Sequence, residues 1–193
     1  GATGYTGKVV CEYISKNYQN TNLKWALSGR DKSKIKSLIS SLNLTSIPYL
    51  IADSNNKNSL LDMTKMTKTI CSTVGPYSKY GTLLVEACIE SKTNYCDITG
   101  ETHWIRKIIN KYHTKAIKNK VKIINACGFD SIPSDLGIFY AQNNMKENIG
   151  KYASKIYMRV IAMKGGVSGG TIYSFLNILK EARKNKTIRK IVN

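Results

Sequence analysis

GATGYTG, residues 1–7, is the stretch that decides the fold, and it leads directly into an apolar-periodic run over 8–18. Its glycines have the spacing G-x-x-G-x-x-G, a variant of the dinucleotide-binding turn that joins a first strand to a first helix. The first glycine permits a tight turn, the second lets backbone approach a pyrophosphate, and the third lets helix and strand pack closely. N–H groups at the start of the helix then favour the phosphate charge.

The residues behind the third glycine support this interpretation. Val9, Val10, Tyr13 and Ile14 repeat at helical spacing on one face. A glycine triplet alone also occurs in ordinary loops, so the helix behind it is what favours the dinucleotide-binding turn. Such a turn requires a buried strand before Gly1, and we therefore interpret the chain as a fragment without its first strand.

Length and composition indicate a globular protein. The 193 residues suffice for one full domain and the start of another, and 42% hydrophobic with 22% charged residues is an ordinary globular balance. There is no apolar run of 18 residues and no signal peptide at this N-terminus. The cysteines are odd in number and form no C-x-x-C, so we predict reduced core residues of an intracellular protein and no metal site: Cys11, Cys71, Cys88, Cys96 and Cys127.

The formal net charge of +18 has two interpretations. It could mark binding to nucleic acid or to an anionic membrane. However, the basic residues are mostly Lys and are spread along the chain, which favours a solvated Lys-rich surface and no nucleic-acid partner. The denser stretches 106–122 and 180–190 remain candidates for contact with an acidic partner.

Strand-like and helix-like segments alternate through the first 150 residues. Strands are predicted at 23–28, 48–52, 69–74, 95–98 and 121–125, with helices at 8–18, 32–42, 58–65, 82–91 and 104–118. This alternation predicts an α/β fold over 1–150, a doubly wound Rossmann-type parallel sheet. The pattern then changes to a period-two strand at 155–163 and a glycine-rich stretch at 165–171. Residues 151–193 are therefore predicted to begin a second α/β domain for substrate binding or dimerisation.

Residues 29–31, Gly-Arg-Asp, lie where such folds select their cofactor. An acidic side chain there binds the ribose hydroxyls of NAD, whereas an Arg accommodates the 2′-phosphate of NADP. Arg30 comes first, Lys32 and Lys34 reinforce its charge, and Arg binds phosphate in a bidentate manner. We predict NADP over NAD, with Asp31 as a helix N-cap, and a surface Arg in a loop as the alternative.

Other strand ends would face the same crevice. Asp53 either lies near the adenine or caps the helix predicted at 58–65. Gly75, Pro76 and Tyr77 interrupt the strand predicted at 69–74, and they would border the nicotinamide half of the cofactor. The glycines of 165–171 either bring backbone close to a ligand or form a flexible connector.

The stretch 127–137 gathers two carboxylates and two hydroxyls at a strand-to-helix junction, where Ser134 and Asp135 suit a helix start. If a protein acid assists catalysis, the candidates are Asp130, then Asp97 or Tyr77, because each lies at or after a strand end that faces the crevice. A turn or cap role is the alternative for each.

Six motifs occur in a recognisable order: GATGYTG, SGRD, VGPYSKYG with VEAC behind it, YCDITGE, GFDSIPSDLG and VSGGT. In this order the chain resembles the saccharopine dehydrogenase-like oxidoreductases, which include the trans-acting enoyl reductases of lipid biosynthesis. The resemblance extends to about residue 174 and covers the front half of a typical member. It implies an NADP-binding Rossmann domain whose pyrophosphate is held by Gly1, Thr3, Gly4, Tyr5, Thr6 and Gly7.

The resemblance also implies hydride transfer between NADP(H) and an imine, enoyl or keto group of a small-molecule or lipid-derived substrate. We expect an intracellular protein, cytosolic or peripherally associated with an anionic membrane or lipid droplet, that could form a homodimer. A short-chain-dehydrogenase-like reductase is disfavoured, because none of the twelve tyrosines has a Lys four positions on. A non-catalytic NADP-binding sensor or membrane-surface scaffold is the alternative of a different class.

Overall fold

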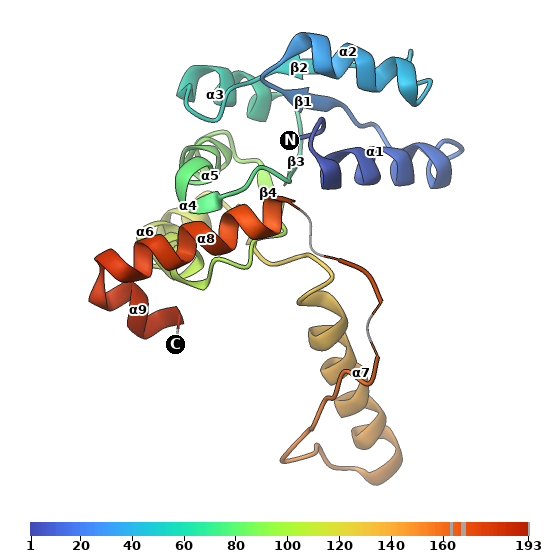
Figure 1. Cartoon of the computed structure of the whole chain (residues 1–193). Helices are drawn as coiled ribbons and strands as arrows, with labels where there is room; N and C mark the ends of the chain where they lie inside the picture. Colours follow the sequence, from blue (N-terminus) through green and yellow to red (C-terminus); the bar gives the residue numbers. More distant parts are fainter. Residues whose placement is uncertain (163, 167–168, 193) are drawn as a thin grey trace.

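The computed structural model describes residues 1–162, 164–166 and 169–192. Its strands are β1 (Leu27–Gly29), β2 (Tyr49–Ile51), β3 (Thr69–Ser72), β4 (Asn94–Asp97) and β5 (Ile123–Ile124). They pair in parallel as β1–β2 and β3–β4–β5 (Figure 1). Parallel neighbours require a crossover connection, and helices connect these strands. The predicted doubly wound α/β fold is thereby confirmed.

The helices of the described residues follow the predicted alternation closely. They are α1 (Tyr5–Asn17), α2 (Lys32–Ser41), α3 (Lys57–Lys65), α4 (Tyr77–Tyr80), α5 (Thr82–Glu90), α6 (Thr102–Lys118), α7 (Ile132–Ile149), α8 (Gly169–Lys184) and α9 (Lys186–Val192). Local chemistry sets several ends. Asp31 accepts a hydrogen bond from the N–H of Lys34 at 3.1 Å, so its predicted N-cap role in α2 is confirmed. Gly150, in the left-handed region at φ +74°, ends α7.

Gly1 lies between the two sheets. Its terminal amine donates to the carbonyl of Ser28 in β1 at 3.2 Å, and its own carbonyl accepts from Thr73 Oγ1, one residue beyond β3, at 3.2 Å. From this point the strand order runs outward in opposite directions, through β1 to β2 and through β3 to β5. Such a topological switch point is where doubly wound sheets bind ligands. The strand predicted before Gly1 lies outside the chain and stays a prediction.

Two apolar cores hold the sheets and helices together. The smaller one packs α1 and α2 on β1, through Cys11, Leu27, Ile35, Leu38 and Leu44. The larger one joins α3, α5 and α6 to β4, and its least exposed members include Val85, Ala87, Cys88, Tyr95, Trp104, Ile108 and Tyr112. The helices of these two cores, α1, α2, α3, α5 and α6, each bury part of their apolar face, as the sequence periodicity indicates.

Residues 132–162, here called the arm, comprise α7 and the segment that follows it. Figure 1 shows the arm projecting away from the sheets. The strand predicted at 155–163 is absent from 155–162, and Met163 lies outside the described residues. The prediction was wrong there because a strand needs a hydrogen-bonded neighbour. Instead, Tyr157 is 80% exposed and Ile161 is 97% exposed. The domain boundary at 150 remains a prediction.

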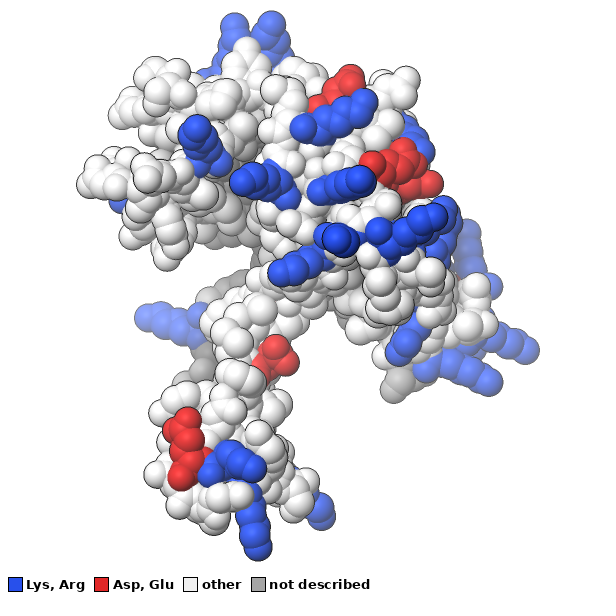
Figure 2. All heavy atoms as spheres, turned by 180° about the vertical axis from the view of Figure 1, so that it is seen from behind, with Lys and Arg blue, Asp and Glu red and all other residues white. Residues whose placement is uncertain are grey.

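Two surface properties bear on possible partners. Figure 2 shows Lys and Arg side chains spread over this face, from the sheet-containing part to the tip of the arm. Within the described ranges, Lys16 pairs with Glu12 and Lys57 with Glu90. Among the described residues, no helix has the length and apolar character needed to cross a bilayer.

Candidate functional site

Residues 1–7 form a tight turn, here called the cradle, that runs straight into α1. A Cβ placed on Gly7 would collide with the carbonyl oxygen of Gly1 and would meet Ala2 Cα at 2.8 Å. Gly4 is the N-cap, with its N–H bonded to the Gly1 carbonyl at 3.1 Å and its carbonyl bonded to the N–H of Lys8 at 2.9 Å. Only glycine at position 7 therefore lets the helix pack directly on the turn.

The N-terminus of α1 suits an anion. Its first turn contains no acidic residue, and no side chain in the described part of the chain caps it. The first N–H groups of a helix lack partners within the helix, and the dipole there favours negative charge. On the outer side, a Cβ added to Gly4 would meet only the Gly1 carbonyl, at 3.4 Å. The cradle therefore fits a pyrophosphate by its open side and its free backbone donors.

Arg30 directly follows β1, the strand that contacts the cradle through Ser28, and its side chain is exposed. The adjacent carboxylate is already occupied, since Asp31 Oδ1 accepts from Ser33 Oγ at 2.7 Å and from the N–H of Lys34 at 3.1 Å. These bonds, the Ser33 hydroxyl above all, lower the pKa of Asp31. The carboxylate of Asp31 thus caps α2, the Arg30 side chain is exposed at this strand end, and the role of Arg30 in binding the 2′-phosphate stays a prediction.

Asp53 follows β2 and shapes a turn. Its Oδ1 accepts from the N–H of Asn55 at 2.8 Å, and its own N–H donates to Ser59 Oγ at 3.1 Å. The N-cap of α3 is Asn56, which accepts from the N–H of Ser59 at 3.1 Å. The alternative in which Asp53 caps this helix is therefore wrong, while its place near the adenine stays a prediction.

Residues 75–77, here called the strap, link β3 to α4 and depend on a carboxylate. Glu101 is 1% exposed, and its two oxygens accept from the N–H of Tyr77 at 2.6 Å and from the N–H of Ser78 at 3.0 Å. Hydrogen bonds between a carboxylate and backbone N–H groups are among the stronger kind. We infer that Glu101, which the sequence analysis included only within the motif YCDITGE, fixes the backbone of the strap.

The Tyr77 phenol points into the protein. Its hydroxyl donates to the carbonyl of Ser72 at 3.0 Å, and its ring lies 5.6 Å from that of Trp104. Burial raises the pKa of this phenol well above its usual value, and the negative charge of Asp97 raises it further. To act as an acid, Tyr77 would have to release this bond, so its contribution in this structure is the shape of the strap.

Asp97 is fully buried at the end of β4 and is surrounded by donors. Its Oδ2 accepts from Tyr95 Oη and Asn125 Nδ2, both at 2.8 Å. Its Oδ1 accepts from the N–H groups of Thr99 at 3.0 Å and Ala126 at 3.1 Å. Four bonds account for the lone-pair sites of a carboxylate. Asp97 therefore ties β4 to the loop after β5, and a catalytic role for it stays a prediction.

Asp130 differs from the other two catalytic candidates because its side chain is exposed. It lies in the turn between Gly128 and Ser131 that precedes α7. A Cβ on Gly128 would meet Ile98 Cβ at 3.3 Å, so the structure brings this turn against the residue that follows Asp97. The ends of β4 and β5 are thus adjacent, as their parallel pairing requires, and a catalytic role for the exposed Asp130 stays a prediction.

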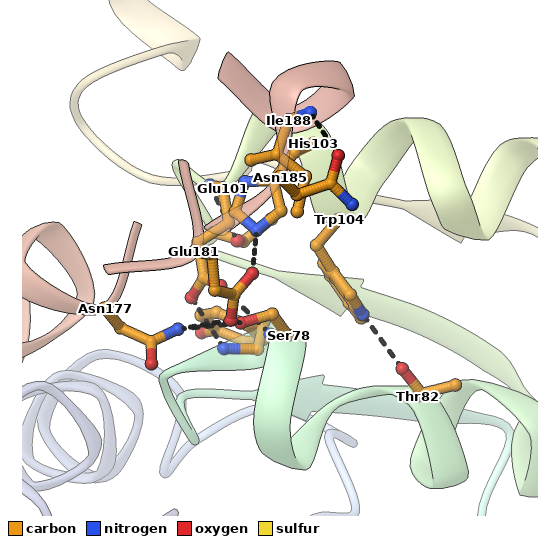
Figure 3. A network of polar contacts seen from close by, with 11 residues as sticks. Ser78, Thr82, Glu101, His103, Trp104, Asn177, Glu181, Asn185 and Ile188 are labelled. Atoms are coloured by element: carbon orange, nitrogen blue, oxygen red, sulfur yellow. Dashed lines mark hydrogen bonds and ion pairs between the residues drawn. The ribbon is translucent and has the colours of Figure 1, made fainter. Parts of the chain in front are cut away.

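Helix α8 packs across the strap through a polar network (Figure 3). Asn177 Nδ2 donates to Ser78 Oγ at 3.0 Å and to Glu181 Oε1 at 2.8 Å. Ser78 Oγ also donates to Glu181 Oε1 at 3.0 Å, and His103 Nε2 lies 3.0 Å from Glu181 Oε2. Asn177 and Glu181, about a hundred positions beyond α4 in the sequence, therefore contact the residue that follows the strap, Ser78. This contact could not be derived from local sequence.

Comparison with known proteins agrees with this geometry. The family model of the saccharopine dehydrogenase NADP-binding domain matches residues 1–124. A putative trans-acting enoyl reductase of Mycobacterium tuberculosis is 35% identical over 192 residues, which cover 98% of this chain and 45% of that protein. The trans-acting enoyl reductase of Mycobacterium bovis is 32% identical over 196 residues, which cover 100% of this chain and 46% of the relative. The chain thus spans about half the length of these relatives.

Among solved structures, apo saccharopine dehydrogenase (L-Glu forming) from Saccharomyces cerevisiae matches with a TM-score of 0.57. The sequence identity is 14%, with 75% of this chain and 29% of that chain covered, so this likeness concerns the fold alone. Together the fold and the cradle define a Rossmann-type dinucleotide-binding protein. The chain belongs to the saccharopine dehydrogenase-like family of NADP-dependent oxidoreductases. The predicted family and the preference for NADP are confirmed.

Proposed function

We propose that this chain forms the NADP-binding part of an oxidoreductase that transfers hydride between NADP(H) and an imine, enoyl or keto group of a small or lipid-derived substrate. The observation that carries the proposal is the cradle, where Gly7 leaves no room for a Cβ and α1 begins without an acid or a side-chain cap. The names of the mycobacterial relatives support an enoyl substrate within this range.

Each part of the site has a distinct task in this proposal. The open backbone donors of the cradle bind the pyrophosphate, and Arg30 binds the 2′-phosphate of NADP. Glu101 holds the strap in place, so that the strap backbone borders the nicotinamide. Bound nicotinamide supplies the redox chemistry itself. Asp130 would exchange a proton with the substrate, a role that the exposure of its carboxylate near the end of β5 supports.

Cofactor selectivity gives the direct test. Replacing Arg30 by Ala removes a charge-assisted phosphate contact, which corresponds to a loss of about 10-fold or more in NADPH affinity. NADH affinity should stay the same, because NADH lacks the 2′-phosphate. Titration of cofactor fluorescence measures both. Arg106→Ala, at an exposed Arg on α6, is the matched control and should change neither affinity. Equal losses for NADPH and NADH in Arg30→Ala would contradict the assignment.

Turnover is tested separately from binding. The chain and its full-length protein are incubated with NADPH and candidate imines, enoyl thioesters and ketones, and consumption of NADPH is followed by fluorescence. Turnover that falls in Asp130→Asn with unchanged NADPH affinity would support an acid role for Asp130. Tight NADPH binding by the full-length protein without turnover of any candidate class would instead favour a non-catalytic NADP sensor.

Contact with an anionic membrane is a further part of the proposal, which the formal net charge of +18 supports and which Figure 2 illustrates by the excess of basic over acidic side chains on that face. Electrostatic binding weakens as salt shortens the Debye length. Sedimentation with vesicles that contain phosphatidylserine should therefore show binding at low salt that is lost at high salt. Vesicles of phosphatidylcholine alone are the control. Binding that is equal on both vesicle types would count against an electrostatic contact.

A further inference from the structure

Two cysteines face each other across neighbouring strands. Cys71 on β3 and Cys96 on β4 are register partners in the parallel ladder. The residues that flank Cys96, Tyr95 and Asp97, are buried on the core side of the sheet, so the two cysteines share the opposite side. Neighbouring strands lie about 4.8 Å apart, which is inside the Cα separation that a disulfide spans. The backbone therefore permits a bond between the two sulfurs.

The two thiols interact and are accessible. Cys71 is exposed and Cys96 is half-buried. A hydrogen bond from the Cys96 thiol lowers the pKa of Cys71 to about 7, and the same interaction raises the pKa of Cys96. Cys71 is thus the thiol of the pair that more readily forms the reactive thiolate, with the Cys96 thiol beside it as hydrogen-bond donor. By contrast, burial raises the pKa of Cys88 to about 12.

We propose that Cys71 and Cys96 are a redox-active dithiol that hydrogen peroxide converts into an intramolecular disulfide, and that this disulfide loosens the cofactor cradle. In the first step the Cys71 thiolate attacks one peroxide oxygen, the O–O bond breaks, and Cys71 sulfenic acid and hydroxide form. In the second step the Cys96 sulfur attacks the Cys71 sulfur, the S–O bond breaks, and the Cys96 proton leaves with the oxygen as water. Peroxide is reduced and both sulfurs are oxidised.

The link to the cradle follows from the position of β3. A disulfide draws the two Cβ atoms to about 3.8 Å, closer than the spacing of undistorted strands, so β3 moves toward β4. Two residues beyond Cys71, Thr73 Oγ1 donates to the Gly1 carbonyl, and a Cβ on Gly1 would meet the same atom at 2.6 Å. Movement of β3 toward β4 withdraws Thr73 from Gly1. The disulfide between Cys71 and Cys96 therefore weakens the contact between Thr73 and Gly1 that supports the cradle.

Peptide mapping tests the bond. Trypsin sites place each of the five cysteines in a separate peptide, with Cys71 in 69–79 and Cys96 in 93–106. After peroxide treatment of the reduced chain, mass spectrometry without reductant should show these two peptides joined, with the loss of two hydrogens. Dithiothreitol should separate them. Absence of this joined pair, or a predominant link from Cys96 to Cys127, overturns the proposal.

Variants fix the order of the steps. In Cys96→Ser, the Cys71 sulfenic acid cannot resolve and should be trapped by dimedone, whereas Cys71→Ser should give neither the trapped acid nor the disulfide. Cys127→Ser, at a half-buried cysteine near the same sheet end, is the matched control and should retain the disulfide. Loss of the disulfide in Cys127→Ser would also overturn the proposal.

The effect of the disulfide on the cradle is measured by NADPH titration. This measurement rests on the proposed function. Oxidised chain should bind NADPH several-fold more weakly than reduced chain, and the loss should be absent in Cys96→Ser. A joined 69–79 and 93–106 pair with unchanged NADPH affinity overturns the link to the cradle. Reduced chain that does not bind NADPH would instead refute the proposed function, and the peptide map would still decide the dithiol.

Discussion

The sheet-containing part of the chain and the arm differ in one physical respect. Residues 1–131 fold around two buried clusters, whereas α7 in the arm has no buried residue. The arm is not short of apolar side chains, since Phe139 is 65% exposed and Tyr140 is 72% exposed. Parallel strands and crossover helices bring partners to the first part. The comparison teaches that apolar pattern gives tertiary structure only where topology supplies a packing partner.

Limited proteolysis should show the largest difference between the arm and the sheet-containing part. The arm has basic cleavage sites at Lys146, Lys151, Lys155 and Arg159, on backbone without a packed core. If local opening there costs almost nothing and global unfolding costs at least about 5 kcal/mol, trypsin should cut the arm on the order of 10³ times faster than the core. Gel analysis with timed samples measures both rates. Simultaneous loss of arm and core would show that they unfold as one unit.

Removal of a large core side chain should have the next largest effect. Trp104 is 1% exposed, packs against Tyr77 and donates from Nε1 to Thr82 Oγ1 at 3.0 Å. Trp104→Ala should lower the free energy of unfolding by about 3–5 kcal/mol, because it leaves a cavity and an unpaired hydroxyl. Urea denaturation followed by circular dichroism measures it. A loss below about 1 kcal/mol would mean that this core is not packed as described.

The strap should become less stable when one carboxylate oxygen of Glu101 is replaced by nitrogen. Glu101→Gln keeps the shape of the side chain but replaces one of the two accepting oxygens by an N–H₂ group, which faces the N–H of Tyr77 or Ser78. The expected cost in the free energy of unfolding is about 1–3 kcal/mol, the penalty for an unsatisfied buried donor.

Glu147→Gln, in the exposed last turn of α7, is the matched control for this variant and should leave the free energy of unfolding unchanged. The same urea titrations compare both substitutions. Equal effects at positions 101 and 147 would contradict the role that we assign to the buried carboxylate.

The smallest effect is expected in the arm. Phe139→Ala removes an aromatic ring of similar size to those in the core, yet this ring is mostly exposed. The free energy of unfolding of the sheet-containing part should change by less than about 0.5 kcal/mol. Measured beside Trp104→Ala, this result sharpens the contrast between the two regions. A cost above about 2 kcal/mol would show that α7 packs on the core in solution.

The local sequence pattern predicted most of the alternating strands and helices. It identified some residues of the site and missed others. The N-cap at Asp31 and the cradle both depend on residues that are close in sequence, so short-range chemistry was enough to identify them. Glu101 was missed as a site residue because its two donors lie on α4, beyond an intervening helix. The strand predicted at 155–163 failed over 155–162 because its period-two pattern indicated a preference but could not supply a neighbouring strand.

The sequence by itself determined the dinucleotide-binding turn and the order of strands and helices, and it gave the prediction that Arg30 selects NADP, because each depends on glycine positions, charge and periodicity within a few residues. Only the tertiary structure decided which carboxylates are engaged, that the Tyr77 phenol faces inward, and that Cys71 and Cys96 are neighbours. Hydrogen-bond partners and burial arise when crossovers bring distant segments together, and no local window of sequence contains both sides of such a contact.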